Sequence, residues 1–268
     1  MRLHALSLGV LVGVACSLAS PCSASAQTIS LQPVTADQQP AEIPASSSFA
    51  QPSRGFFSQI LSDFRRLPSK ETFTILSVGA VGAAAGHAFD GRATNSLSQS
   101  QGFGGFSSAG NTIGSLQVQF GAALATYTLG KTLHQPRVTA IGADLVRAQI
   151  MTQTLTQGIK LAAGRTRPDG TQYSFPSGHT STAFATATVV QRHLGWKAGI
   201  PAYGVAAYVA SARVQSKRHY LSDVAFGAAL GIAAGRTVTI GRGDARFAVS
   251  PALAPGGAGV NVTWVGRK

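Results

Sequence analysis

Residues 177–193, SGHTSTAFATATVVQRH, open with a serine and a glycine and continue as small and apolar residues that end in three polar ones. Ser177 is a favoured N-cap residue, and Gly178 lets the backbone approach a ligand closely. We therefore predict a helix that begins after Ser177, with the backbone N–H groups of Gly178 and His179 at its positive end. Such an end is suited to hold an anion.

Helical patterns continue on both sides of this segment. Further apolar helices are predicted over residues 72–89, 113–133, 138–163, 197–213 and 221–238. Residues 91–111 are rich in Gly, Ser and Gln, and we expect a loop there. Six helices with mostly short connections predict an all-α fold, a six-helix bundle. The chain contains 31 Gly and many Ala, whose small side chains let helices pack closely.

The first 26 residues have the pattern of a secretory signal peptide. A basic start precedes an apolar stretch over residues 6–18, and residues 24–26 read Ala-Ser-Ala, a small-residue cleavage site. Cys16 and Cys22 both lie in this segment, so the mature chain would contain no cysteine. That excludes a disulfide scaffold and a thiolate site. We expect export to a bacterial periplasm; the alternative is an uncleaved N-terminal anchor.

Residues 27–68 are expected to form a flexible linker that ends in a short amphipathic helix. Large apolar residues recur there at helical spacing: Phe56, Phe57, Ile60, Leu61 and Phe64. The favoured role of this helix is to pack on the main domain, and the alternative is to lie on a membrane surface.

The remaining chain divides into a helical domain over residues 69–240 and a tail over residues 241–268. In the tail, residues 246–250 and 260–264 alternate apolar with polar side chains, and a Pro-Gly-Gly turn begins at Pro255. This pattern predicts a C-terminal β-hairpin.

The charge balance points to an anionic partner. Lys and Arg number 22 and Asp and Glu only 9, which gives a net charge of +13. No run of basic residues is longer than two and no zinc-finger spacing is present, so no nucleic acid is expected as a partner. A phosphorylated substrate, including an anionic lipid, fits the charge instead.

Whether the helices span a membrane is left open by hydropathy. Several are long enough, but polar side chains interrupt their interiors: Gln117, Gln119, Asp144, Arg147, Gln149, Gln153 and Gln157. Polar groups at this density are unfavourable in lipid. The sequence therefore favours a soluble or peripherally attached bundle over a spanning one.

Three clusters of polar residues carry the candidate chemistry. They are Lys160 with Arg167 and Pro168, then Pro176 with Ser177, Gly178 and His179, and then Arg213 with His219 and Asp223. Arginine offers phosphate a planar fork, and lysine offers a point charge. His219 and Asp223 are four apart on one face of the sixth helix, so the carboxylate can hold one imidazole N–H and leave the other nitrogen as a nucleophile. The ordinary alternative is a surface salt bridge between Asp223 and Lys217 or Arg218.

Together and in this order, the clusters resemble the type-2 phosphatidic acid phosphatase superfamily. Its pattern is Lys-x6-Arg-Pro, then Pro-Ser-Gly-His, then Ser-Arg-x5-His-x3-Asp. One position departs, since Ala212 stands where the third motif has Ser, which puts one supporting hydrogen bond in doubt. The resemblance covers roughly residues 70–240.

The resemblance implies a helical bundle of the acid phosphatase and vanadium haloperoxidase type, and hydrolysis of phosphomonoesters without a metal or another cofactor. It implies that His219 attacks phosphorus to form a phosphohistidine, that Asp223 orients His219, and that His179 protonates the leaving oxygen and then activates water. The residues that would hold the phosphoryl oxygens are Lys160, Arg167, Ser177, Gly178 and Arg213.

Two other functions share this pattern: a vanadium-dependent haloperoxidase, and a non-catalytic envelope protein that keeps the fold. The sequence does not decide between a soluble and a lipid phosphate substrate, nor the oligomeric state. The exported start favours a site outside the cytoplasm, in the periplasm or associated with the cell membrane.

Overall fold

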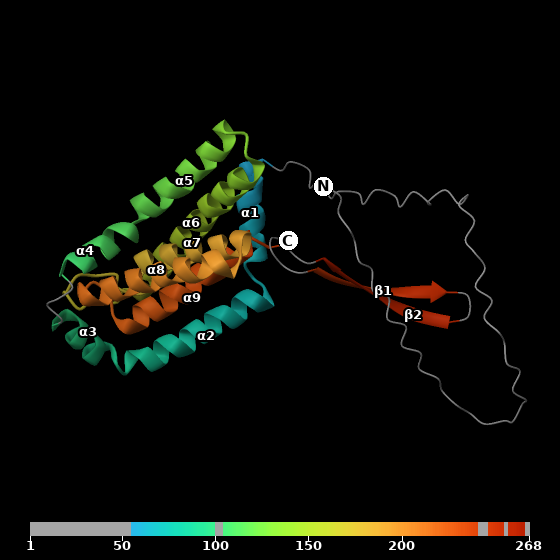
Figure 1. Ribbon diagram of the computed structural model, residues 1–268. Helices are drawn as coiled ribbons and strands as arrows, with labels where there is room; N and C mark the ends of the chain where they lie inside the picture. The colour runs from blue at the N-terminus through green and yellow to red at the C-terminus, as the bar shows by residue number, and fades with distance from the viewer. Residues whose placement is uncertain (1–54, 100–103, 241–245, 255–256, 266–268) are drawn as a thin grey trace, which may run out of the picture. The chain divides into compact units, whose positions relative to one another are not determined.

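The computed structural model describes residues 55–99, 104–240, 246–254 and 257–265. The helices belong to one compact unit, Gly55–Asp244, and the strands to another, and each unit is described by itself. Nine helices lie in the described part of the helical unit (Figure 1): α1 Phe56–Arg66, α2 Lys70–His87, α3 Asp90–Gln99, α4 Gly104–Ile113, α5 Leu116–Thr132, α6 Pro136–Ala163, α7 Gly178–Leu194, α8 Trp196–Gln215 and α9 Leu221–Val238.

Local signals set several helix ends. Ser69 caps α2, because its Oγ accepts a hydrogen bond from the Thr72 N–H at 3.1 Å. Pro136 is the first residue of α6, where a missing N–H costs nothing. Gly164 ends α6 in the left-handed conformation, with φ at 54°.

Small residues let α7 and α9 pack closely at the centre of the bundle, and α8 and α2 flank this pair (Figure 1). A Cβ added at Gly231 of α9 would lie 2.2 Å from the Ser181 carbonyl oxygen of α7, so only glycine fits there. The main hydrophobic core is built mostly of small side chains: Ala123, Leu145, Val146, Ala148, Met151, Ala185, Val189, Ala234 and Val238.

The prediction of a loop over residues 91–111 was wrong, and so was the count of six helices. The helices α3 and α4 occupy the described parts of this segment. Buried side chains hold α3, since Asp90 and Thr94 are both 5 % exposed. In α4, a Cβ at Gly110 would lie 2.6 Å from that of Ala212 on α8. Tertiary contacts therefore override the weak helix propensity of Gly and Ser.

The amphipathic helix α1 packs on the bundle, as the favoured interpretation expected. Phe56 and Phe64 contact the main core, and the Asp63 carboxylate accepts a hydrogen bond from Arg147 of α6 at 2.5 Å. Phe57 and Leu61 stay exposed on its outer side.

The strands β1 (Arg246–Ala254) and β2 (Gly257–Val265) pair antiparallel in the tail, from Arg246 opposite Val265 to Ala254 opposite Gly257. The predicted signal peptide and the linker over residues 27–54 lie outside the described residues.

Among the described helices, α9 alone is long and apolar enough to cross a membrane by itself, and 67 % of it is buried inside the bundle. Together α2 and α3 meet the same criterion, but they are bent by 73° at their junction.

Candidate active site

The three predicted clusters meet at one end of the bundle, the end at which α3 and α4 lie in Figure 1. Lys160 is in the last turn of α6, His179 in the first turn of α7 and Arg213 in the last turn of α8. Hydrogen bonds join these segments. The Ser177 N–H donates to the Asp223 carbonyl oxygen at 3.0 Å, and the His219 N–H donates to the Arg213 carbonyl oxygen at 3.2 Å.

His219 and Asp223 form a buried pair. His219 Nδ1 lies 3.5 Å from Asp223 Oδ2, and both side chains are almost fully buried. His219 precedes α9 and is not on its face, which corrects the sequence interpretation; Tyr220 is the N-cap of that helix. Because Nδ1 faces the carboxylate, Nε2 is the nitrogen directed away from it, as a nucleophile requires.

The Asp223 carboxylate is surrounded by donors. Oδ1 accepts a hydrogen bond from Arg165 Nη1 at 2.7 Å. Oδ2 accepts one from the Tyr220 N–H at 2.9 Å and another from the Ser174 hydroxyl. Burial raises the pKa of Asp223, but the neighbouring His219 and the hydrogen bonds from Ser174 and the Tyr220 N–H outweigh burial and hold the pKa below its usual value. Asp223 is therefore an ionised carboxylate inside the protein.

The alternative interpretation of Asp223, a surface salt bridge with Lys217 or Arg218, is wrong. Asp223 is fully buried, and its arginine partner is Arg165. Arg218 pairs instead with Asp169, at 3.0 Å.

Three cations line the site without a carboxylate of their own. Lys160 Nζ donates to the carbonyl oxygens of Tyr173 at 2.5 Å and Ser174 at 3.2 Å. Arg213 Nη1 donates to Asn111 Oδ1 of α4 at 2.7 Å. Within the described residues, neither these two cations nor Arg167 form an ion pair. The buried Nε atoms of Arg167 and Arg213 also lack a hydrogen-bond partner there. Cations left in this state are suited to bind an anion.

Burial and mutual repulsion shift the pKa values of this cluster downward. Burial, with smaller contributions from Arg167 and Arg213, lowers the pKa of Lys160 from 10.5 to about 8. Burial also lowers the pKa of His219 to about 4, with Lys160 and Arg213 acting in the same direction against Asp223. The pKa of His179 falls to about 3, through burial and then the charge of Arg213. Both imidazoles are therefore neutral at pH 7.

The first turn of α7 supplies the backbone donors. Ser177 occupies the N-cap position, but its Oγ accepts a hydrogen bond from the Thr180 hydroxyl at 3.0 Å and none from a backbone N–H, which corrects the expected cap. The Gly178 and His179 N–H groups are in the first turn, where no intrahelical acceptor exists. They lie at the positive end of a 17-residue helix.

Sequence reasoning missed four residues of this site: Asp90, Asn111, Arg165 and Ser174. A signal was available for Arg165, a third cation inside the spacer between Lys160 and Arg167. A signal was also available for Asp90, because acids are rare in this chain. Nothing local marked Asn111, which lies in the segment expected to be a loop.

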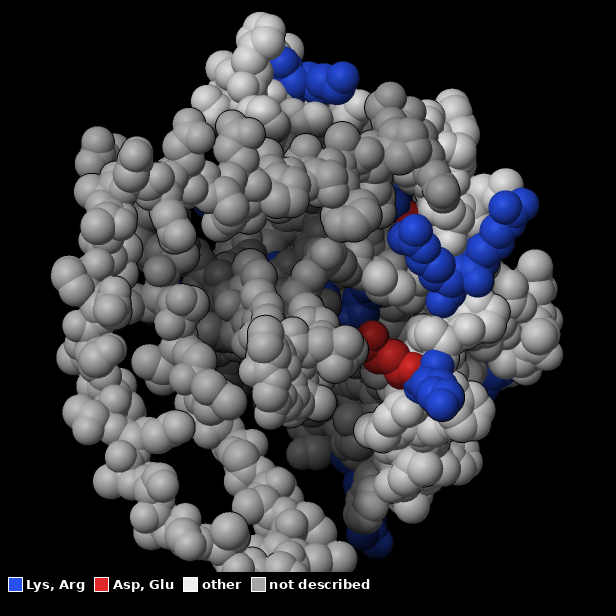
Figure 2. All heavy atoms as spheres, turned by 90° about the vertical axis from the view of Figure 1, so that its right-hand side faces the viewer, with Lys and Arg blue, Asp and Glu red and all other residues white. Residues whose placement is uncertain are grey.

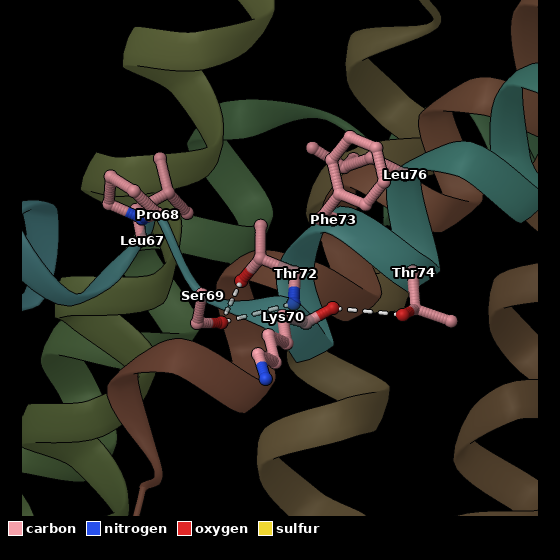
Figure 3. Close-up of a pocket in the computed structure, with 8 residues that line it drawn as sticks. All are labelled: Leu67, Pro68, Ser69, Lys70, Thr72, Phe73, Thr74 and Leu76. Carbon is pink, nitrogen blue, oxygen red and sulfur yellow. Dashed lines mark hydrogen bonds between the residues drawn. The ribbon is translucent and has the colours of Figure 1, made fainter.

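A separate cavity of about 730 Å³ lies beside the junction of α1 and α2 (Figure 3). Leu67, Pro68, Phe73 and Leu76 contribute its apolar lining, and none of the predicted site residues lines it. It lies at the α1 end of the bundle, the side turned to the viewer in Figure 2, where the described surface shows several Lys and Arg side chains and few acidic ones.

Among the described residues no group of three or more His, Cys, Asp or Glu could hold a metal ion.

Comparison with known proteins agrees with this site. Residues 141–246 match the model of the PAP2 superfamily, and this segment carries all three clusters. A lipid A 1-phosphatase from Porphyromonas gingivalis is 45 % identical over 80 residues, which are 28 % of this chain and 18 % of that protein. The chain thus spans less than a fifth of that relative's length.

Two solved structures are similar to part of this chain. The crystal structure of Aquifex aeolicus LpxE is 20 % identical with a TM-score of 0.48, over 56 % of this chain and 94 % of that one. The crystal structure of a transmembrane PAP2 type phosphatidylglycerolphosphate phosphatase from Bacillus subtilis is 18 % identical with a TM-score of 0.48, over 67 % of this chain and 94 % of that one.

Proposed function

We propose that this protein is a metal-independent phosphatase that hydrolyses lipid phosphate monoesters through a phosphohistidine. The observation that carries the proposal is the buried His219–Asp223 pair, which faces three cations that pair with no carboxylate in the part of the chain that the structure describes. The cations and the N–H groups of Gly178 and His179 bind the phosphoryl oxygens. They stabilise the negative charge that spreads over those oxygens in the transition state.

In the first step, His219 Nε2 attacks phosphorus. A P–N bond forms, the P–O ester bond breaks, and its electron pair leaves with the ester oxygen, which takes a proton from His179. In the second step, His179 removes a proton from water and the water oxygen attacks phosphorus. The P–N bond breaks, its electron pair returns to Nε2, and inorganic phosphate leaves.

His179 must carry a proton in the first step, although its pKa in the free site is about 3. After burial, the largest causes of this depression are positive charges, beginning with Arg213. A bound phosphoryl dianion neutralises these charges and raises the pKa of His179 toward its usual range. Binding of the substrate therefore favours the protonated form of His179, the general acid.

Exposed apolar side chains beside the site support a lipid substrate. Leu161, next to Lys160, is 72 % exposed; Phe89, next to Asp90, is 52 % exposed; and Tyr173, whose carbonyl accepts from Lys160, is 46 % exposed. Large apolar groups in water around a cationic site are suited to contact acyl chains. We infer membrane association on the same ground, with an exported location as expected from the first 26 residues.

The test is phosphate release by the purified full chain with a metal chelator present, from a detergent-dispersed lipid phosphate and from p-nitrophenyl phosphate. His219→Asn is expected to abolish turnover. His134→Asn, at an exposed histidine in the turn before α6, serves as the matched control. A dependence on added Mg²⁺, or wild-type turnover by His219→Asn, would contradict the proposal.

The lipid preference has its own pair of variants. Leu161→Ser should lower turnover of the dispersed lipid and leave turnover of the soluble ester unchanged, because only the lipid has acyl chains that contact the exposed Leu161 side chain. Leu129→Ser, an equivalent change on α5 at a side chain that is 53 % exposed, should alter neither. Equal losses on both substrates would assign Leu161 to the site and not to acyl chains.

A further inference from the structure

Asp223 is tied through one arginine to a second buried carboxylate. Arg165 Nη1 donates to Asp223 Oδ1 at 2.7 Å, and Nη2 donates to Asp90 Oδ2 at 2.8 Å. The guanidinium carbon lies 4.3 Å from the centre of the Tyr220 ring. Both Nη atoms of the planar Arg165 guanidinium are engaged, so the guanidinium cannot rotate without losing one of the two charged hydrogen bonds.

Asp90 also holds the start of α9. Its Oδ1 accepts a hydrogen bond from the Ser222 N–H at 2.9 Å, and its Oδ2 accepts one from the Ser222 hydroxyl at 2.7 Å. An N–H in the first turn of a helix has no partner within that helix. Asp90 therefore caps α9 from a position 132 residues away, outside the segment that matches the PAP2 superfamily.

We propose that Asp90 and Arg165 are positioning residues that fix the Asp223 carboxylate against His219 Nδ1 and so aim Nε2 at phosphorus. The inference rests on the proposed function. Asp223 Oδ1 is held by Arg165, while Oδ2 faces His219. Loss of the Oδ1 bond leaves a buried oxygen unsatisfied, and the carboxylate rotates to recover a donor. Rotation misaligns the His219 ring without changing the cations that bind the phosphoryl group.

The experiment compares Arg165→Lys and Asp90→Asn in the full-length chain, with lipid phosphate as substrate. Arg165→Lys keeps the positive charge but loses the planar guanidinium that donates to two carboxylates at once. Asp90→Asn keeps the size of the side chain but loses its negative charge. For each we expect kcat to fall about 10- to 100-fold and KM to change less than about threefold, because geometry and not binding is lost. Glu71→Gln is the matched control. Glu71 of α2 contacts α9 through Arg236, near the opposite end of α9 from Asp90.

The pH profile separates positioning from a merely structural role. His219 faces Asp223 of α9, Lys160 of α6, Arg213 of α8 and His179 of α7. Arg165→Met removes a positive charge next to Asp223, so the carboxylate attracts a proton on His219 more strongly. The acid limb of kcat/KM should then move to higher pH in Arg165→Met and stay in place in Arg165→Lys.

Wild-type kcat in both folded variants would overturn the inference, and so would a loss carried by KM alone. If Arg165→Met does not fold, the isosteric Asp90→Asn and the charge-preserving Arg165→Lys still decide the question through kcat. A wild-type chain that releases no phosphate refutes the proposed function itself, a result seen before any variant is made.

Discussion

Deprotonation of Lys160 should lower kcat/KM of the proposed phosphatase activity at alkaline pH. Its ammonium is 7 % exposed and donates to the carbonyl oxygens of Tyr173 and Ser174. Burial, followed by the charge of Arg167, lowers the pKa of Lys160 from 10.5 to about 8. As pH rises through that value the site loses one of the cations that bind phosphate. A phosphomonoester is already a dianion there, because its second pKa is about 6.

The expected size of the effect follows from the titration curve. With a pKa of about 8, about nine-tenths of Lys160 is charged at pH 7 and about one-tenth at pH 9. Loss of this charge should lower kcat/KM about tenfold, in addition to any fall caused by deprotonation of His179. An unshifted lysine would lose less than about 5 % of its charge over this range. The alkaline fall that Lys160 causes should lie at higher pH in kcat than in kcat/KM, because the bound phosphate dianion stabilises the Lys160 ammonium.

The assay is kcat/KM for a soluble phosphomonoester at half-unit steps from pH 6 to about pH 9.5. In Lys160→Arg this additional fall of about tenfold should be absent, because a guanidinium stays charged throughout, while any fall caused by His179 remains. Lys70→Arg, at an exposed lysine at the start of α2, should leave the wild-type profile in place. A ratio of wild-type to Lys160→Arg kcat/KM that stays constant from pH 7 to pH 9 would refute the reasoning.

Three further predictions concern packing and charge. Gly231→Ala should destabilise the fold by about 1–3 kcal/mol in thermal unfolding, because its Cβ would lie 2.2 Å from the Ser181 carbonyl oxygen; Gly82→Ala, with open space around it, should be neutral or stabilising. Arg147→Met should cost about 3–5 kcal/mol in denaturant unfolding, because it removes the arginine partner of the buried Asp63 and one of the partners of the buried Asp144. That loss should shrink between pH 7 and pH 5: burial raises the pKa of Asp63 to about 6, above its unfolded value, so protonation relieves the unfavourable charge as pH falls. Asn111→Ala should raise KM more than it lowers kcat in steady-state kinetics, because Arg213 loses the acceptor that holds it over the site; an unchanged KM would show that Arg213 needs no such support.

The residues of the proposed catalytic site could be predicted from the sequence. Lys160, His179 and Asp223 lie in short motifs, and the chemistry of each motif depends on residues a few positions apart. Local rules also placed the start of α7 after Ser177 and the amphipathic helix α1 near residue 56. These features depend on backbone geometry within one or two turns, which a sequence expresses directly.

The supporting residues depended on contacts between distant segments. The 91–111 segment reads as a loop, and α3 and α4 form there because Asp90 and Gly110 meet α9 and α8. His219 was expected on a helix face, but the loop before α9 carries it and turns its Nδ1 toward Asp223.

What the sequence determined by itself is which side chains form the candidate site, because the spacing within each motif already specifies cations for an anion and a histidine with its carboxylate. Only the tertiary structure decided how those side chains are oriented relative to one another. Arg165 meets a carboxylate 75 residues earlier in the chain, and α9 takes its cap from 132 residues away. Such pairings follow from the packing of whole helices, and no local pattern records which helices will be neighbours.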